Sequence, residues 1–353
     1  MKRFYVLDAL RCVLALCVTI GHAGALPLFG PVTHTGDVLD LLARGWRTAI
    51  FGPPAVIAFF VISGFCIHYP FAARNERCPI GRFYARRYLR ILTPVICTGA
   101  MSKLLFPNIA FWGVNSIIWN STLWSIVCEE IYYALYPLLN RAGWRLGWKA
   151  ILIASAFPAL AACWFFFPAV DWQDVGIIAT TITLFPIWLS GCYLAENISV
   201  LRREYAPLEM WLRRFAVWGV MWAAALLHFH SSIHQTLSAI GVGVAYYFWI
   251  RAELCYYRNR DPWKILVWGG QWSYSLYLIH PIVIALTFKY EDQLPSSRFG
   301  WLAVIALVLI CSYLFYLVVE KPSHNLARRI PLFGRRKALP EVAPELSLDT
   351  GGG

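Results

Sequence analysis

About ten long apolar segments, separated by short polar stretches, occupy most of this 353-residue chain. A run of about 20 apolar residues is the length that crosses the hydrocarbon core of a bilayer as an α-helix. Charged residues make up only 14% of the chain, against roughly 25% in soluble domains. The sequence therefore predicts an all-α, polytopic transmembrane helix bundle of about ten helices. The apolar segments lie at approximately residues 5–28, 48–71, 91–106, 117–139, 150–168, 176–196, 215–230, 234–250, 265–288 and 300–319.

The basic residues, which give the chain a net charge of +12, gather mainly in the stretches between these segments. When the N-terminus is placed in the cytoplasm and the segments alternate in direction, most of the 31 Lys and Arg residues fall on the cytoplasmic side. This is the distribution that orients membrane helices. It predicts that both termini are cytoplasmic and that membrane lipid, not nucleic acid, is the partner.

The segments are predicted to form one membrane-embedded domain over residues 3–328. Residues 338–353 contain prolines and acids and end in three glycines, which is typical of a disordered cytoplasmic tail. The N-terminal segment imitates a secretory signal peptide. However, Asp8 and Arg11 interrupt its apolar region, and this favours a first helix that is retained.

Neither metal binding nor disulfide formation is predicted. Ten cysteines are scattered along the chain without a Cys-x-x-Cys pair, so no zinc site or disulfide framework is indicated. His228, His230 and His234 gather at a predicted outer loop, but no carboxylate follows nearby to complete a metal site. The chain also lacks a P-loop, a nucleotide fingerprint and a Gly-x-Ser-x-Gly elbow.

Ionisable residues inside membrane spans are costly and are usually functional. Arg11 and His22 lie eleven residues apart in the first segment, so both project from nearly the same helix face, about 16 Å apart. Glu129 in the fourth segment and His280 in the ninth are expected at a depth comparable to that of His22. A histidine beside a carboxylate is a standard general-base arrangement. The alternative is structural: buried polar residues also join helices, and Pro281 beside His280 is consistent with a simple kink.

A basic run from Arg82 to Arg90 leads into the third segment. It has two interpretations that charge alone does not separate. One is a topology signal, or attraction to anionic lipid headgroups. The other is a phosphate-binding mouth, because arginine pairs well with phosphate oxygens.

Six motifs, which occur in order from about residue 3 to about residue 328, resemble those of the acyltransferase 3 family of membrane proteins. Arg11 and His22 match the Arg-x10-His relation of that family, and Glu129 matches the glutamate of its Trp-Ser-x-x-x-Glu segment. Ile126 and Tyr132 depart mildly from the family, where leucine and phenylalanine are common. The motifs are LDALRCVLALCVTIGHAG at 7–24, FFVISGFCI at 59–67, FYARRYLRILTP at 83–94, LWSIVCEEIYYALYPLL at 123–139, WSYSLYLIHPIV at 272–283 and VEKPSHNLARR at 319–329.

This resemblance implies an acyltransferase for groups other than aminoacyl groups (EC 2.3.1). Such an enzyme moves an acyl group, usually acetyl, from cytoplasmic acyl-coenzyme A to a hydroxyl of an extracytoplasmic glycan or lipid-linked sugar. The acyl-coenzyme A is a donor substrate, and no permanently bound cofactor is implied. His22 would remove the hydroxyl proton or briefly carry the acyl group, and Glu129 would orient or assist it. The coenzyme-binding residues implied are Arg11, Arg86, Arg87 and Arg90, and the substrate-binding or supporting residues are His280, Trp124 and Ser273.

The resemblance also implies a multi-pass protein of the cell (inner) membrane, with polysaccharide-biosynthesis proteins as candidate partners. The chain resembles stand-alone members, without the serine-hydrolase domain that is fused to some others. The main alternative is a proton-coupled transporter or flippase of a lipid-linked sugar, in which the buried His and Glu would relay protons. Transporters often carry internal repeats, and the two halves of this chain show no convincing similarity. A receptor or scaffold would not explain the buried charges.

Overall fold

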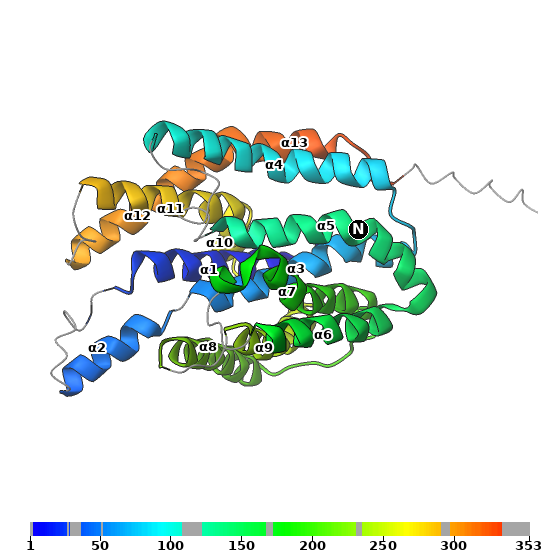
Figure 1. Ribbon diagram of the computed structural model, residues 1–353, viewed down its shortest axis with the longest axis horizontal. Helices are drawn as coiled ribbons and strands as arrows, with labels where there is room; N and C mark the ends of the chain where they lie inside the picture. The colour runs from blue at the N-terminus through cyan, green and yellow to red at the C-terminus, as the bar shows by residue number, and fades with distance from the viewer. Residues whose placement is uncertain are drawn as a thin grey trace, which may run out of the picture.

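The computed structural model describes residues 3–26, 28, 37–50, 52–107, 122–166, 172–230, 235–290 and 297–333. Within these ranges the protein is helical and contains no strand, which confirms the predicted all-α class. Figure 1 shows the helices side by side in one bundle, most of them running in roughly the same direction. The predicted tail at residues 338–353 lies outside the described residues.

In the described part of the chain, ten helices of 18 residues or more each overlap one predicted apolar segment. They are α1 (Tyr5–Ala23), α3 (Gly52–Ala72), α4 (Ile80–Leu105), α5 (Trp124–Leu146), α6 (Trp148–Phe165), α7 (Trp172–Asn197), α8 (Pro207–His230), α9 (Gln235–Tyr256), α11 (Ser273–Tyr290) and α12 (Arg298–Phe315). The shorter elements are α2 (Val38–Thr48), α10 (Lys264–Gly270), the π-helical turn η2 (Tyr316–Glu320) and α13 (Lys321–Arg328). Helices α4 and α8 begin well before their predicted apolar segments, because each continues through basic residues.

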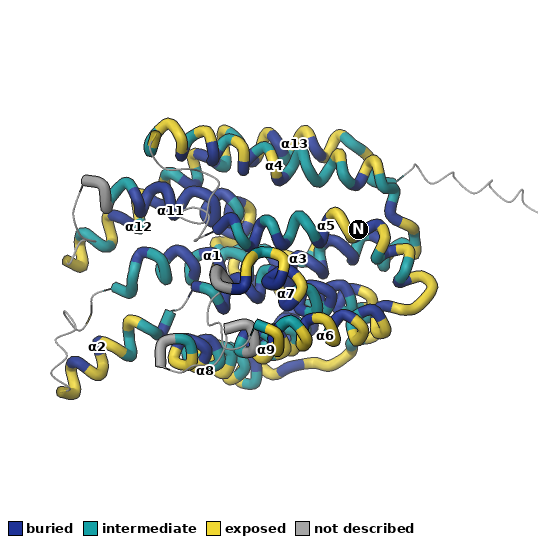
Figure 2. Tube along the Cα trace, viewed as in Figure 1, coloured by how far each residue is buried: buried dark blue, intermediate teal, exposed yellow. Residues whose placement is uncertain are grey.

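Five stretches of the described residues are long and apolar enough to cross a membrane, judged by length and composition. They are Tyr5–Ala23, Val38–Ala72, Trp148–Phe165, Val175–Asn197 and Arg298–Arg328. Large apolar side chains also lie on the outside of the bundle: Trp164 of α6 is 86% exposed and Phe299 of α12 is 85% exposed. The outward sides of many helices are exposed in Figure 2, as expected where lipid surrounds the protein. The chain is thus a membrane protein, while the number of crossings and the side of the termini stay predictions.

Helix α3 packs against α1, α7 and α9. Buried residues surround this helix instead of forming one stripe, a pattern typical of a helix enclosed by others. Gly64 on α3 and Gly191 on α7 allow the two backbones to meet. A Cβ atom on Gly64 would collide with the Trp188 carbonyl, and one on Gly191 would collide with the Val61 carbonyl. Small residues permit such close crossings in membrane bundles.

A Gly64→Ala substitution is expected to destabilise the fold, because the added methyl group forces α3 and α7 apart. Overpacking of a well-packed core costs about 1–3 kcal/mol, which should lower the midpoint of thermal unfolding measured in detergent. Gly219 on α8 is the matched control, since a Cβ atom there would meet nothing within 4 Å. Equal midpoints for Gly64→Ala and Gly219→Ala would show that the crossing tolerates a side chain.

Helix α4 packs against α13, the turn η2 and α11 along one side of the bundle. In Figure 1, α4 and α13 form the top layer and α11 lies below them. Helix α1 packs against α3 and α11. These contacts bring the beginning, middle and end of the chain together around the interior of the bundle.

Candidate active site

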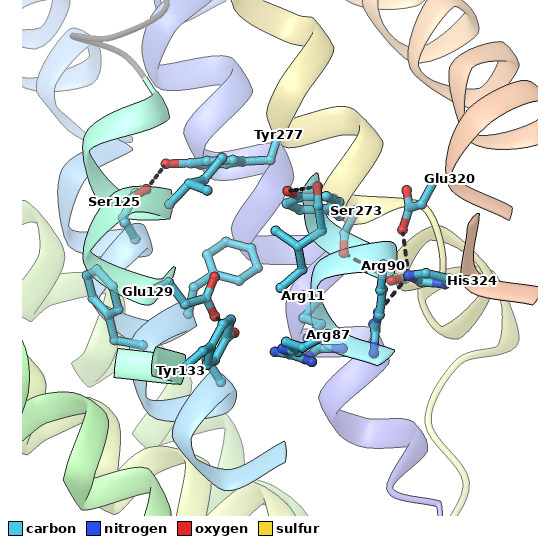
Figure 3. Close-up of a pocket in the computed structure, with 18 of the residues that line it drawn as sticks. Arg11, Arg87, Arg90, Ser125, Glu129, Tyr133, Ser273, Tyr277, Glu320 and His324 are labelled. Atoms are coloured by element: carbon cyan, nitrogen blue, oxygen red, sulfur yellow. Dashed lines mark hydrogen bonds and ion pairs between the residues drawn. The ribbon is translucent and has the colours of Figure 1, made fainter. Parts of the chain in front are cut away.

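A cavity of about 120 Å³ lies inside the bundle, among α1, α3, α4, α5, α11 and the η2–α13 segment. Figure 3 shows Arg11 in this cavity, between Glu129 on one side and Arg90 on the other. Five residues singled out by the sequence therefore come together here from distant parts of the chain. They are Arg11, Arg87, Arg90, Glu129 and Ser273. The other polar lining residues are Ser63, Ser125, Tyr133, Gln271, Tyr274, Tyr277, Glu320 and His324.

The three arginines of the cavity are incompletely paired within the described residues. Arg11 Nη1 lies 4.0 Å from the Asp8 carboxylate, which is the outer limit of an ion pair. The Arg87 guanidinium lies 4.0 Å from the ring centroid of Tyr133, and its buried Nε has no hydrogen-bond partner. Arg90 Nε donates to His324 Nε2 at 2.6 Å. Because buried donors without partners are costly, the cavity favours a ligand that supplies anionic or carbonyl oxygens.

Glu129 is held by a series of hydrogen bonds that ends at its carboxylate. Trp188 Nε1 donates to Ser63 Oγ at 3.2 Å, and Ser63 Oγ pairs with the Tyr133 hydroxyl at 2.7 Å. The Tyr133 hydroxyl in turn donates to Glu129 Oε1. Glu129 lies in the second turn of α5. Within the described residues it makes no hydrogen bond to His22, so its predicted orienting role has no direct contact behind it.

The carboxylate of Glu320 and the ring of His324 are site groups to which the sequence assigned no role. Glu320 ends the π-helical turn η2 and is 1% exposed. Its Oε2 accepts from the backbone N–H of Ser275 at 3.0 Å and from Ser275 Oγ at 2.5 Å. His324, one turn later, lies 3.7 Å from Glu320 and accepts from Arg90. Single π-helical turns occur frequently at functional sites, and an ionisable pair at the end of an apolar segment was the available signal.

His22, the predicted catalytic residue, is in contact with His280. His22 lies in the last turn of α1, and its Nδ1 is 2.8 Å from Nε2 of His280 on α11. The two ring centroids are 5.0 Å apart and the planes are inclined by 15°, so the rings lie edge to edge in nearly one plane, as an N–H···N hydrogen bond requires. A Cβ atom on Gly21 would lie 2.8 Å from the backbone nitrogen of Gly52, so α1 and α3 touch at this level. The structure thus joins two histidines that the sequence had placed only at similar depth.

Tyr277 lies between this histidine pair and the cavity. Neither His22 nor His280 lines the cavity as the described residues define it. Tyr277 does line it, and its ring centroid is 6.0 Å from that of His280. The Tyr277 hydroxyl pairs with Ser125 Oγ at 2.6 Å, as the dashed line in Figure 3 shows. The cavity and the histidine pair are therefore neighbouring regions with Tyr277 at their boundary.

Arg86 does not line the inner cavity but a second one, of about 460 Å³. The second cavity is also lined by Arg74 and by the aromatic ring of Phe333, whose centroid is 4.3 Å from the Arg74 guanidinium carbon. Because Arg87 and Arg90 line both cavities, the two cavities adjoin. We call the second cavity the arginine mouth.

Two further predicted residues have smaller parts in this arrangement. Ser273 begins α11, and its Oγ donates to the Gly270 carbonyl at 3.0 Å. Trp124, the first residue of α5, does not line the cavity, but its ring centroid is 6.5 Å from that of Phe60, which does. Among the described residues no group of three or more His, Cys, Asp or Glu side chains is placed to hold a metal ion. The side chain of His230 and the whole of His234, in the outer histidine cluster, lie outside the described part.

Comparison with known proteins identifies the family of the chain. A family model described as an acyltransferase domain matches residues 4–317. The chain is similar to the acyltransferase MdmB of Streptomyces mycarofaciens, with 24% identity over an alignment 351 positions long that covers 84% of this chain and 87% of the relative. No solved structure shows significant similarity to the chain. Since the family match spans most of the chain, the protein belongs to the acyltransferase 3 family.

Proposed function

We propose that the protein transfers an acyl group, preferentially acetyl, from cytoplasmic acyl-coenzyme A to a hydroxyl of an extracytoplasmic glycan or lipid-linked sugar. One observation carries the proposal: two adjoining cavities share incompletely paired arginines, and the inner cavity approaches the histidine pair. Coenzyme A combines several phosphates with a thin, amide-containing arm. Its two parts match a wide basic entrance and a narrower interior that offers guanidinium donors.

The coenzyme fits the two cavities in one direction. Its phosphates would pair with Arg86, Arg87 and Arg90 in the arginine mouth, and the pantetheine arm would enter the inner cavity beside Arg11. The arm follows the direction of α1, along which His22 lies about three turns beyond Arg11. The thioester would then reach the level of Tyr277, next to the histidine pair.

The chemistry at the histidine pair is general-base catalysis. As the acceptor hydroxyl oxygen attacks the thioester carbonyl, His22 takes the hydroxyl proton; the C–S bond then breaks, and coenzyme A leaves as the thiol. A positioned base of this kind contributes roughly 10²–10⁴-fold to the rate. Four further points of the proposal rest on what is usual in the family. They are the preference for acetyl, the sugar acceptor, the inner-membrane location and the assignment to EC 2.3.1.

The test is to purify the protein in detergent, titrate it with labelled acetyl-coenzyme A and follow release of coenzyme A thiol with a panel of sugar acceptors. We expect saturable binding, and thiol release that increases when the right acceptor is present. Absence of both binding and cleavage, with longer acyl donors and lipid-linked sugars also tested, would contradict the proposal. Proton-coupled uptake of a lipid-linked sugar into proteoliposomes would then favour the transport alternative.

An Arg87→Gln variant is expected to bind acyl-coenzyme A at least about tenfold more weakly. A hydrogen bond to a charged group contributes roughly 1.5–3 kcal/mol, and about 1.4 kcal/mol corresponds to tenfold in affinity. The dissociation constant can be measured by titration with the non-hydrolysable thioether analogue. Arg82, which is exposed on the same helix and lines neither cavity, gives the matched control Arg82→Gln. Equal affinities for the two variants would exclude Arg87 from coenzyme binding.

A further inference from the structure

The hydrogen bonds of His280 define which of its ring nitrogens carries a proton. His280 Nδ1 lies 3.0 Å from the backbone carbonyl oxygen of Leu276. A carbonyl oxygen only accepts, so Nδ1 of His280 carries the hydrogen. His280 is 0% exposed, and within the described residues no carboxylate bonds to its ring, so the neutral imidazole is the stable form. Its Nε2 is therefore an acceptor.

The protonation of His280 determines that of His22. Since His280 Nε2 accepts, the nitrogen 2.8 Å away, Nδ1 of His22, must donate. A neutral His22 then has its lone pair on Nε2, and no described residue makes a hydrogen bond to that atom. The two rings are inclined by only 15°, so the Nδ1–H of His22 lies in the plane of both rings and points at Nε2 of His280. The contact of α1 with α3 at Gly21 holds this arrangement.

We propose that His280 is a positioning residue that holds His22 in the tautomer whose Nε2 takes the acceptor's proton. This inference rests on the proposed function. The acceptor O–H bond breaks and its proton goes to Nε2 of His22, while the hydroxyl oxygen bonds to the thioester carbon. The C–S bond then breaks with its electron pair on sulfur, and Nε2 returns the proton to give the free thiol. The imidazolium of His22 that forms between these steps keeps its Nδ1–H bond to His280.

His280 takes the place that the sequence had suggested for Glu129. The Glu129 carboxylate accepts a hydrogen bond from Tyr133 and lines the inner cavity, where its negative charge balances the guanidinium groups. A neutral imidazole orients His22 without placing a second charge beside it. The partner that fixes the tautomer is thus another histidine, 258 residues away along the chain.

Two amide variants separate positioning from packing. In His280→Gln the side-chain amide lies near the position of the ring Nε2, so its oxygen can accept from His22. In His280→Asn the amide lies near the position of Nδ1, where it can bond to Leu276 but does not reach His22. We expect His280→Asn to lower kcat at least about 10²-fold, because the base is no longer held in one tautomer, with KM for acyl-coenzyme A nearly unchanged. We expect His280→Gln to recover most of the wild-type kcat.

Nitrogen NMR of the ¹⁵N-histidine-labelled wild-type protein, with His22 assigned by its loss in His22→Gln, gives a second readout that does not depend on activity. The expected signature is a protonated Nδ1 and an unprotonated Nε2 on His22. An Nε2-protonated His22, or equal loss of kcat in the Asn and Gln variants, would overturn the positioning role. A wild-type protein that binds no acyl-coenzyme A and transfers no acyl group would instead contradict the proposed function, and the NMR result would still decide the tautomer.

Discussion

Replacing His22 with alanine is expected to lower kcat for acyl transfer by roughly 10²–10⁴-fold, the contribution of a positioned general base. Binding of acyl-coenzyme A should be nearly unchanged, because His22 lies beyond Tyr277 and outside the inner cavity. The measurement combines steady-state kinetics with titration of the same preparation with acyl-coenzyme A. His228→Ala, at a histidine near the end of α8, is the matched control and should retain wild-type kcat.

Two results for His22→Ala would contradict the assignment in different ways. Wild-type kcat would mean that another group takes the hydroxyl proton. Loss of donor affinity together with kcat, in a folded variant, would mean that the coenzyme phosphates or arm bind at the histidine pair and not at the arginines. Loss of kcat with unchanged affinity for acyl-coenzyme A is the result expected for a catalytic base that lies beyond the arginines that bind the coenzyme.

Replacing Glu320 with leucine is expected to lower the free energy of unfolding by about 3–5 kcal/mol, the usual effect of removing one partner from a buried charged network. The carboxylate is 1% exposed, accepts two hydrogen bonds from Ser275 and lies beside the His324 ring that pairs with Arg90. Without the Glu320 carboxylate, the backbone N–H and the hydroxyl of Ser275 lose their acceptor, and Arg90 loses a nearby negative charge. Donor affinity should also fall, because Arg90 lines both cavities.

The conservative variant Glu320→Gln separates the two effects of the Leu substitution. A glutamine oxygen can still accept from Ser275, so most of the stability should return, whereas the negative charge is lost. Denaturation in detergent and titration with acyl-coenzyme A measure the two quantities separately. If the leucine variant is as stable as the wild type, the network around η2 does not hold α11 and α13 together.

The long helices could be predicted from the sequence because hydrophobic length is a local property. Their true starts could not always be predicted: α4 begins at Ile80 and α8 at Pro207, in basic stretches that apolarity alone excludes. The inner cavity was partly predictable, since Arg11, Arg87, Arg90 and Glu129 stand in recognisable motifs. The Tyr133–Glu129 contact spans one helical turn and was readable from spacing.

The pairing of buried groups on different helices could not be read from the sequence. His22 faces His280 because of the rotation of α1 and α11 about their axes and the closeness of α1 to α3 at Gly21. These depend on the packing of many side chains at once, which no local pattern encodes. The place of His22 near the end of α1 was predictable, but its neighbour across the interface was not. For that reason Glu129 was a reasonable but indirect choice as the partner of His22.

The position of Tyr277 has a consequence for the electrical integrity of the membrane. In the proposed topology an aqueous entrance on one side extends deep into the bundle, and a continuous opening to the other side would let protons and ions leak down their gradients. The Tyr277 ring, hydrogen-bonded to Ser125 and with its centroid 6.1 Å from that of Phe59, lies where the cavity meets the histidine pair. In the proposed reaction only the slender tip of the acyl-coenzyme A would have to pass this ring, so the acyl group could reach the opposite face while the bilayer remains an insulator.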